Sequence, residues 1–358
     1  METPEPIRIL IVDDSRIFRG MLQAVLEQIP GVQVVGSVFS GEKALEFIAR
    51  SPPDLITLDI EMPGISGLET LREIAKRNVQ AKPLAPVDTI LVSALTKKGA
   101  MVTVEGLLLG ALDFLCKPSE PSEQANRDLL RRSIEQKLVV VRRRRVDQQR
   151  RAGSGRMQRS GAGTAGVRGT NGQYRAIAIG TSTGGPEALG ILLPALTRQC
   201  NVPILIVQHI LEGLSSYLAE SLSRKCGRPV VEARDDLVVQ PGMICLAKSG
   251  RHMVVRSQDG VIRIGLSDAP PEKGCRPAVN VFLRSAAVVY GSRLAATILT
   301  GMGDDGAEGV RAVKRVGGYV IAQDEASSVV WGMPRAAAET GAVDEVLPLS
   351  KIAVGAPR

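Results

Sequence analysis

The sequence predicts an α/β protein made of two doubly wound, parallel-sheet domains joined by a basic linker. The length of 358 residues is enough for about two domains. In both halves, short apolar runs alternate with amphipathic helical stretches, which is typical of parallel sheets with helices on both faces. Between the halves lies a segment rich in Gly, Ser, Thr and Arg that has too few apolar residues to form a core.

The composition excludes several classes of protein. Hydrophobic residues make up 44% and charged residues 23%, which is ordinary for a globular chain and excludes a wholly disordered one. No apolar run approaches the ~18–20 residues of a membrane helix, and the N-terminus has no secretory signal pattern. The five cysteines are widely spaced and form no C-x-x-C pair, which predicts free thiols. We therefore expect a cytoplasmic protein without membrane insertion.

The net charge of +8 is concentrated in one segment. Residues 127–175 hold 14 Lys and Arg and three acidic residues, a net charge of +11, which leaves −3 for the rest. Apolar residues at three- and four-residue spacing predict a helix at its start, and the part after Gly153 is expected to be flexible. We expect residues 126–174 to be a basic helix and flexible linker between domains at 1–125 and 175–350. Residues 127–172 contain no aromatic side chain for base stacking, so a solvated tether is favoured over a nucleic-acid contact.

In the first domain, polar residues follow the predicted strands. The strands are expected at residues 7–12, 34–37, 55–59, 89–93 and 113–117, with helices at 15–28 and 41–50. The carboxyl ends of parallel strands meet at one edge of a sheet. Five polar side chains fall at these ends: Asp13, Asp14, Asp59, Ser93 and Lys117.

These five residue types predict a phosphoryl site. Three carboxylates at one edge repel each other, and oxygen ligands suit Mg²⁺. A metal ion flanked by a lysine and a hydroxyl neutralises phosphoryl oxygens, and one carboxylate is itself a candidate nucleophile. Helix capping is the alternative for a single Asp, but it does not explain five such residues at four strand ends.

The strings IVDDS, LDIEMPGISGL, VSA and CKP resemble the receiver domain of two-component response regulators, over residues 7 to about 125. The resemblance implies a flavodoxin-like fold. It also implies that Asp59 accepts a phosphoryl group from a histidine kinase, that Asp13, Asp14 and Asp59 hold Mg²⁺, and that Ser93 and Lys117 contact the phosphoryl oxygens.

The second domain has three noteworthy strand-to-loop junctions. A strand at residues 176–179 enters the pattern G-x-S-x-G around Ser182, which is the spelling of a nucleophile elbow. A strand at residues 203–207 ends near His209. A strand at residues 295–300 enters a glycine loop that carries Met302, Asp304 and Asp305.

A hydroxyl, an imidazole and a carboxylate at three strand ends form a hydrolase set. Either Asp304 or Asp305 is a candidate to orient His209, with helix capping as the alternative. Loop amides near Met302 are candidates to bind an oxyanion. His252, the other histidine, begins a hairpin strand and is expected at the surface or in a cap. A different interpretation is that the glycine loops bind a phosphorylated ligand and no triad exists.

Five strings decide between these interpretations: IGTSTGGPEAL, VQHI, GCRPAVNVFLRSAA, ILTGMGDDGAEG and AQDEASSVVWGMPRAA. They resemble the CheB-type protein-glutamate methylesterases of bacterial chemotaxis, which have a doubly wound methylesterase domain. The resemblance implies that Ser182 is the nucleophile, His209 the general base and then acid, and Asp305 the orienting carboxylate. The Met302 amide would bind the oxyanion, and hydrolysis would need no cofactor. Asp304 stands where the family usually has Asn, and Ile210-Leu211 where it usually has Met-Pro.

The resemblance also implies partners and regulation. Methyl-accepting chemoreceptors would be the substrate, demethylated at glutamate methyl esters and deamidated at glutamines, and a chemotaxis histidine kinase would supply the activating phosphoryl group. A receiver-controlled transcription regulator is less favoured, because the second half has no helix-turn-helix signal. A non-catalytic scaffold would require a damaged triad, and all three residue types are present.

Overall fold

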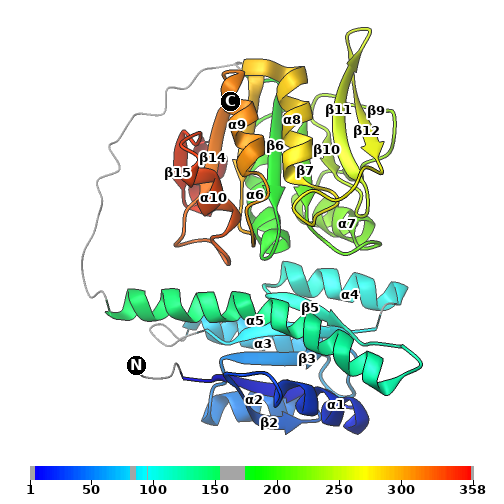
Figure 1. Ribbon diagram of the computed structural model, residues 1–358, viewed down its shortest axis with the longest axis vertical. Coiled ribbons are helices and arrows are strands. Elements are labelled where there is room, and N and C mark those ends of the chain that lie inside the picture. The colour runs from blue at the N-terminus through cyan, green and yellow to red at the C-terminus, as the bar shows by residue number, and fades with distance from the viewer. Residues whose placement is uncertain (1–4, 81–85, 95, 154–173, 356–358) are drawn as a thin grey trace. The chain divides into compact units, whose positions relative to one another are not determined.

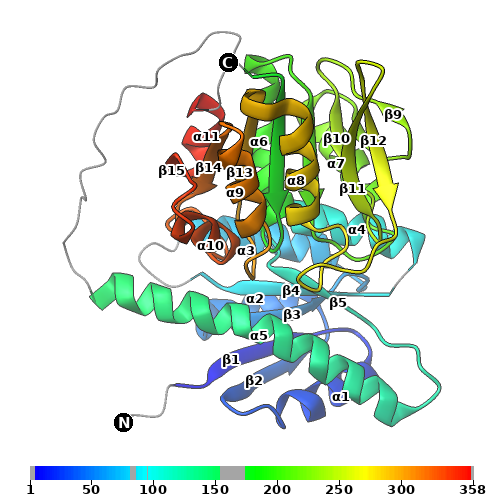
Figure 2. The same ribbon diagram turned by 45° about the horizontal axis from the view of Figure 1, so that its top comes forward.

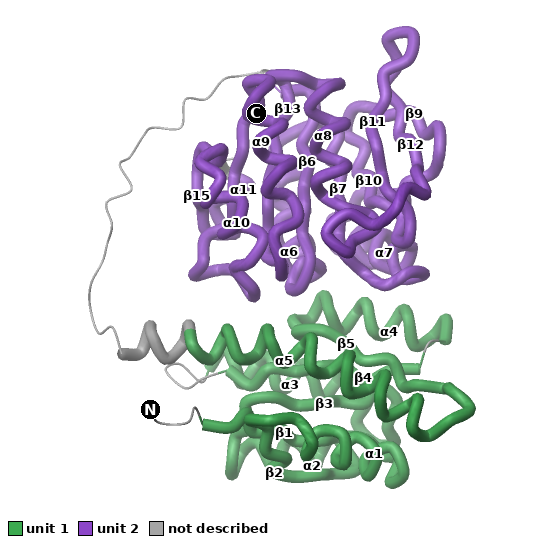
Figure 3. Tube along the Cα trace, viewed as in Figure 1, with its two compact units in different colours: residues 1–157 green, residues 158–358 purple. Residues whose placement is uncertain are grey.

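The computed structural model describes residues 5–80, 86–94, 96–153 and 174–355. The chain divides into two compact units, residues 1–157 and residues 158–358 (Figure 3). The flexible tether expected after Gly153 lies outside the described residues. Within the described ranges, no helix has both the length and the apolar character needed to cross a membrane.

The first unit is built on a five-stranded parallel sheet in the order β2-β1-β3-β4-β5 (Figure 1). This is a doubly wound order, with the reversal between β1 and β3. All five predicted strands are confirmed, with ends that differ from expectation by at most two residues. Their bounds are β1 (Ile7–Val12), β2 (Val32–Val38), β3 (Leu55–Asp59), β4 (Asp88–Ser93) and β5 (Asp113–Cys116).

Helices cover both faces of this sheet. One face carries two helices that contact each other, and the other face carries three in succession. The first pair is α1 (Arg16–Leu26) and α5 (Glu123–Gly153), and the second group is α2 (Gly41–Arg50), α3 (Gly67–Gln80) and α4 (Lys97–Leu108). The predicted helix at 15–28 begins where the Ser15 hydroxyl accepts a hydrogen bond from the Phe18 amide, an N-cap.

The arginine run within α5, residues 142–145, forms ion pairs and hydrogen bonds with the rest of the first unit. Arg144 pairs with the Asp88 carboxylate at 2.5 Å, and Arg145 lies 3.3 Å from the Asp54 carboxylate. Arg142 donates to the carbonyl of Pro30 at 2.6 Å. One side of the helix is buried as the apolar spacing predicted, through Leu130, Ile134, Leu138 and Val141. This part of the expected linker therefore belongs to the first compact unit.

The second unit has a seven-stranded parallel sheet in the order β15-β14-β13-β6-β7-β10-β8. The strands are β6 (Ala176–Thr181), β7 (Ile204–Gln208), β8 (Val230–Glu232), β10 (Ile244–Leu246), β13 (Leu294–Ile298), β14 (Tyr319–Gln323) and β15 (Glu345–Leu347). From β6 the chain builds one half of the sheet and then returns to β13 for the other. The topological switch point, where doubly wound sheets bind ligands, is therefore between β6 and β13.

Helices enclose this sheet as well. On one face α6 contacts α7 and α11, and on the other α8, α9 and α10 follow each other (Figure 2). Their bounds are α6 (Gly185–Gln199), α7 (Ser215–Cys226), α8 (Val279–Tyr290), α9 (Ala307–Arg315), α10 (Met333–Glu339) and α11 (Leu349–Gly355).

A small antiparallel sheet, β9 (Leu237–Val238), β11 (His252–Gln258) and β12 (Val261–Ser267), packs on α8 through β11. The hairpin strand expected at His252 is confirmed, but its surface position is wrong. His252 is fully buried, accepts a hydrogen bond from the Ala278 amide at 3.1 Å and faces the Pro270 carbonyl at 3.0 Å. The core-facing side chains of β11 are Met253 and Val255, whereas His252 is covered by the segment of Pro270 and Ala278 that precedes α8.

Candidate active site

The carboxyl edge of the first sheet brings acidic residues and a lysine together. Nζ of Lys117 lies 2.8 Å from Oδ2 of Asp13 and 2.7 Å from Oδ2 of Asp59. Asp13 and Asp59 are buried, whereas Asp14 is exposed. One carboxylate oxygen of each of the three lies within 4.8 Å of the others. The sheet thus places the expected acidic cluster and the lysine at one point.

The electrostatics of this cluster favour a bound cation. Burial and the neighbouring Asp13 carboxylate raise the pKa of Asp59 to about 6, against the opposing effect of Lys117. Burial lowers the pKa of Lys117, but the two carboxylates outweigh it and raise that pKa overall. Oδ2 of Asp13 is buried and makes no hydrogen bond of good geometry to the described residues, including the nearby ammonium. An oxygen-only donor set with excess negative charge fits Mg²⁺.

Ser93 lies at the same edge, and its hydroxyl makes no hydrogen bond to Asp59. In the pairing of β3 with β4, Asp59 is opposite Val92, so Ser93 is the next residue along β4. Its hydroxyl donates to the Ala94 carbonyl at 3.1 Å. A phosphoryl group on Asp59 would therefore have to draw this hydroxyl away from a local backbone partner.

In the second unit, Ser182 and His209 follow neighbouring strands. Thr181 of β6 pairs with Gln208 of β7, and the His209 amide donates to the Thr181 carbonyl at 3.0 Å. The side-chain amide of Gln208 donates to the carbonyls of Ser182 at 2.8 Å and of His209 at 2.9 Å. This buried glutamine holds the two backbone segments at one edge of the sheet.

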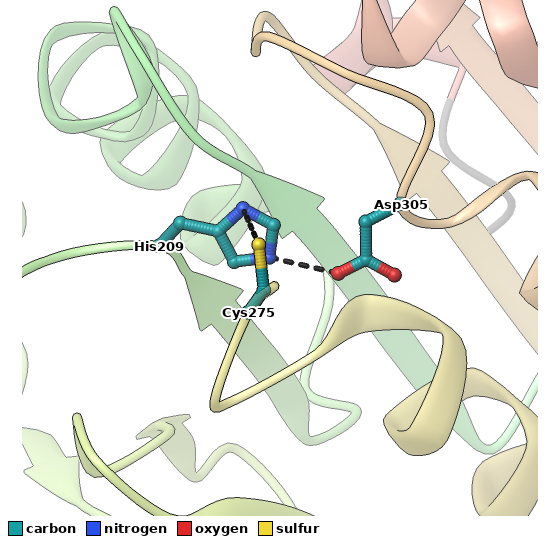
Figure 4. A group of neighbouring side chains, drawn as sticks. All are labelled: His209, Cys275 and Asp305. Carbon is teal, nitrogen blue, oxygen red and sulfur yellow. Dashed lines mark hydrogen bonds and ion pairs between the residues drawn. The ribbon is translucent and has the colours of Figure 1, made fainter. Parts of the chain in front are cut away.

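Asp305 reaches the same edge from the loop after β13. Its Oδ2 accepts a hydrogen bond from Nε2 of His209 at 2.9 Å (Figure 4). It also accepts hydrogen bonds from the amides of Val279 at 2.7 Å and Asn280 at 2.9 Å, at the start of α8. The carboxylate is 2% exposed, and these amides and the positive end of the helix stabilise its charge.

Asp304 has a different environment. It is exposed and forms a 2.7 Å ion pair with Lys273. Adjacent residues of a loop point in different directions, so only Asp305 of this pair contacts the imidazole. The sequence offers both acids as partners of His209, and the geometry favours Asp305.

The environment of His209 favours its charged form. Burial lowers the pKa of His209, but the bonds to Asp305 and Cys275 outweigh burial and raise it to about 9. The imidazole has to be neutral to accept a proton. The neutral fraction of His209, and with it the activity of the base, is therefore expected to increase as the pH rises toward 9.

The Met302 loop lies directly beside Ser182. A Cβ on Gly301 would come within 2.8 Å of the Ser182 Cβ, so the close approach requires glycine. The Met302 amide donates no hydrogen bond to any residue that the structure describes, and its side chain is partly exposed. The amide is thus available to a ligand at this edge.

Ser182 is not hydrogen-bonded to His209 in this structure. The Ser182 hydroxyl makes no hydrogen bond within the described ranges, and Nδ1 of His209 instead faces Sγ of Cys275 at 3.6 Å (Figure 4). Sequence reasoning missed Cys275 and Gln208, although each adjoins a motif residue. Cys275 lies in the string GCRPAVN, and Gln208 directly precedes His209.

Comparison with known proteins identifies the family. Residues 177–355 match the CheB methylesterase family, and residues 9–140 match the response regulator receiver domain. The first match spans half of the chain. The chain belongs to the CheB methylesterase family. The receiver match places the acidic cluster in a receiver domain, as the sequence predicted.

Several CheB relatives match over nearly the full length. A protein-glutamate methylesterase/protein-glutamine glutaminase of Desulfotalea psychrophila is 39% identical, with 97% of this chain and 96% of the relative covered. One of the same name from Trichodesmium erythraeum is 40% identical, with 97% of each covered. The crystal structure of the Thermotoga maritima CheB methylesterase catalytic domain is 39% identical, covers 51% of this chain and 96% of that chain, and has a TM-score of 0.49.

Proposed function

We propose that this protein hydrolyses glutamate methyl esters and deamidates glutamines on methyl-accepting chemoreceptors, through Ser182, His209 and Asp305. The observation that carries the proposal is the 2.9 Å bond between His209 and the buried Asp305, at the edge where Ser182 follows the neighbouring strand. The relatives' name states both activities.

The first half of the reaction is acyl transfer to the serine. Asp305 accepts a hydrogen bond from the Nε2–H group of His209, which leaves the Nδ1 lone pair as the base. Nδ1 takes the Ser182 proton while Oγ attacks the γ-carbonyl carbon of the methylated glutamate. The Met302 amide stabilises the negative charge that develops on the carbonyl oxygen. The C–O bond to the methoxy group then breaks, and His209 gives its proton to the departing methoxide oxygen, which leaves as methanol.

The second half restores the enzyme. His209 takes a proton from water, the resulting hydroxide attacks the acyl carbon, and Ser182 leaves with its proton returned. The product is free glutamate. Glutamine passes through the same acyl-enzyme and releases ammonia. Asp305 keeps its charge throughout, because its three N–H donors stabilise the carboxylate.

The first unit is proposed to control this reaction through Asp59. Asp13, Asp14 and Asp59 would hold Mg²⁺, which neutralises phosphoryl oxygens when bound. Asp59 would accept a phosphoryl group from a chemotaxis histidine kinase, and Lys117 and Ser93 would contact its oxygens. Phosphorylation is proposed to shift the population toward a form in which receptors reach Ser182. We place the protein in the cytoplasm, where such a kinase would act.

Methanol release from methylated receptor tests the hydrolase. Ser182→Ala is expected to lower turnover by at least ~10³-fold, because no hydroxyl remains to form the acyl-enzyme. Ser257→Ala, which removes an exposed hydroxyl of β11, serves as the matched control and is expected to leave turnover unchanged. Turnover by a correctly folded Ser182→Ala protein at the wild-type rate would overturn the proposal.

The regulatory part needs a separate measurement. Methanol release is compared with and without a small-molecule phosphoryl donor and Mg²⁺, in the wild type and in Asp59→Asn. The donor is expected to raise turnover in the wild type only. An equal response of Asp59→Asn would contradict the role of Asp59 and leave the hydrolase assignment intact.

A further inference from the structure

A tight turn holds Cys275 against His209. Glu272 and Cys275 exchange backbone hydrogen bonds of 3.1 and 2.9 Å. Lys273 and Gly274 have φ angles of 53° and 74°, the left-handed values that a type I′ turn requires. Side chains fix this turn at two places, since Glu272 pairs with Arg284 of α8 and Lys273 pairs with Asp304. The turn that carries Cys275 is therefore anchored to α8 and to the loop that follows β13.

The sulfur and the imidazole nitrogen have the spacing of two ligands on one ion. Sγ of Cys275 lies 3.6 Å from Nδ1 of His209. Tetrahedral Zn²⁺ with bonds of about 2.3 Å to sulfur and about 2.0 Å to nitrogen holds its S and N ligands about 3.5 Å apart. The turn and β7 thus present a thiol and an imidazole at the separation that such an ion needs.

Asp305 completes the arrangement from the other side of the ring. Its carboxylate accepts a hydrogen bond from the Nε2–H group, which fixes the tautomer that leaves Nδ1 free for a metal. Metal-binding histidines commonly have such a carboxylate partner on their second nitrogen. One donor atom each from His209, Cys275 and Asp305 lies within 4.8 Å of the other two. Figure 4 shows the thiol and the carboxylate approaching different nitrogens of the ring.

We propose that Cys275 Sγ and His209 Nδ1 form an inhibitory binding site for a thiophilic divalent cation of the Zn²⁺ type. Binding displaces the thiol proton and forms metal–sulfur and metal–nitrogen bonds, while water completes the coordination. The ion takes the nitrogen that would otherwise accept the Ser182 proton, so hydrolysis stops while it is bound. Hard cations such as Mg²⁺ do not bind here, because they prefer oxygen ligands.

The inhibitory role rests on the proposed function, so binding and activity are measured separately on the full chain. Cd²⁺ is titrated while the ultraviolet thiolate-to-metal absorption is recorded, which reports a metal–sulfur bond without any substrate. Zn²⁺ alone is titrated into the methanol-release assay, and each variant is compared with its own activity without Zn²⁺. Cys275→Ser and Cys275→Ala are the test variants. Cys226→Ser is the matched control, a partly exposed thiol whose sulfur forms hydrogen bonds to backbone carbonyls.

The expected result is a Cd²⁺ absorption in the wild type and in Cys226→Ser that is lost in both Cys275 variants. The Zn²⁺ concentration for half-inhibition is expected to rise by at least ~10-fold when Cys275 is replaced, because one of two protein ligands is gone. Mg²⁺ is expected to have no such effect. Unchanged Cd²⁺ absorption or unchanged Zn²⁺ inhibition in Cys275→Ser and Cys275→Ala would overturn the proposal. If neither the wild type nor any variant releases methanol, the proposed function fails. The Cd²⁺ absorption still decides whether the site binds metal.

Discussion

The two sheets of this protein share an architecture and differ in the residues at their carboxyl edges. In the first, buried Asp59 shares the Lys117 ammonium with Asp13, and its pKa is raised to about 6. In the second, buried Asp305 accepts three N–H donors, one of them from His209. Both acids lie beside the topological switch point of a parallel sheet.

In the proposed function Asp59 is a nucleophile and Asp305 is a positioning group, and their different neighbours give the physical reason. Asp59 and Asp13 share a single ammonium, so their excess negative charge favours a bound cation. Asp305 has its charge stabilised by fixed backbone dipoles and the imidazole, so it holds His209 and has little tendency to react itself. The same backbone frame therefore supports two chemistries, and the chemistry follows from the neighbours of each acid.

The largest expected effect separates the two adjacent acids of the second edge. Asp305→Asn is expected to lower methanol release by ~10³–10⁴-fold, because an amide favours the wrong tautomer of His209. Asp304→Asn is the matched control and removes only an exposed ion pair with Lys273, so a change of less than about 3-fold is expected. Neither substitution is expected to alter phosphorylation of Asp59. Equal losses in the two variants would contradict the assignment of Asp305.

The next effect is the pH dependence of hydrolysis. The pKa of His209 is raised to about 9, so only about 1% of the imidazole is neutral at pH 7. The value of kcat/KM is expected to rise about tenfold per pH unit below pH 9 and to level off above pH 9. The total rise from pH 7 to this plateau is expected to be about 100-fold. Cys275→Ala removes one group that raises this pKa and should move the rise to lower pH. A flat wild-type profile between pH 7 and 9 would show that the neutral base is already populated.

The same pKa has a consequence for stability. Because the folded state raises the pKa of His209 above its ordinary 6.5, protonation stabilises the fold fully below pH 6.5. That contribution is expected to fade as the pH rises from 6.5 through about 9. Calorimetry across this pH range measures the Tm of the wild type and of Asp305→Asn. Because the variant lacks the carboxylate that raises the pKa of His209, its Tm is expected to fall less as the pH rises. An equal fall in both proteins would assign the pH effect to other groups.

The smallest effect concerns the first unit alone. Arg144→Ala leaves the buried Asp88 carboxylate without its 2.5 Å partner and is expected to lower the free energy of unfolding by about 1–2 kcal/mol. Arg143→Ala, an exposed neighbour, is expected to change it by less than about 0.5 kcal/mol. Urea unfolding measures both. Methanol release should be unaffected, and equal destabilisation by the two variants would contradict the role of the arginine run in holding α5.

Sequence reasoning located the principal elements because their signals are local. The apolar runs of β1 and β3 and the serine before α1 depend on a few consecutive residues, and their bounds follow from them. The surface position expected for His252 is wrong, because the groups that cover it, the Pro270 carbonyl and the Ala278 amide, come from a later segment of the chain that no local pattern places there. The arginine run was interpreted as a tether because its partners Asp54 and Asp88 lie far away in the chain.

The sequence by itself determined the residue types at the two reactive edges, since each follows a recognisable strand at a fixed spacing. Only the tertiary structure decided how those side chains pair. It placed Asp305 rather than Asp304 on the imidazole, and it brought Cys275 to the opposite nitrogen. The physical reason is that strand order and loop direction set distances between residues remote in the chain, and hydrogen bonds depend on tenths of an ångström that no local pattern encodes.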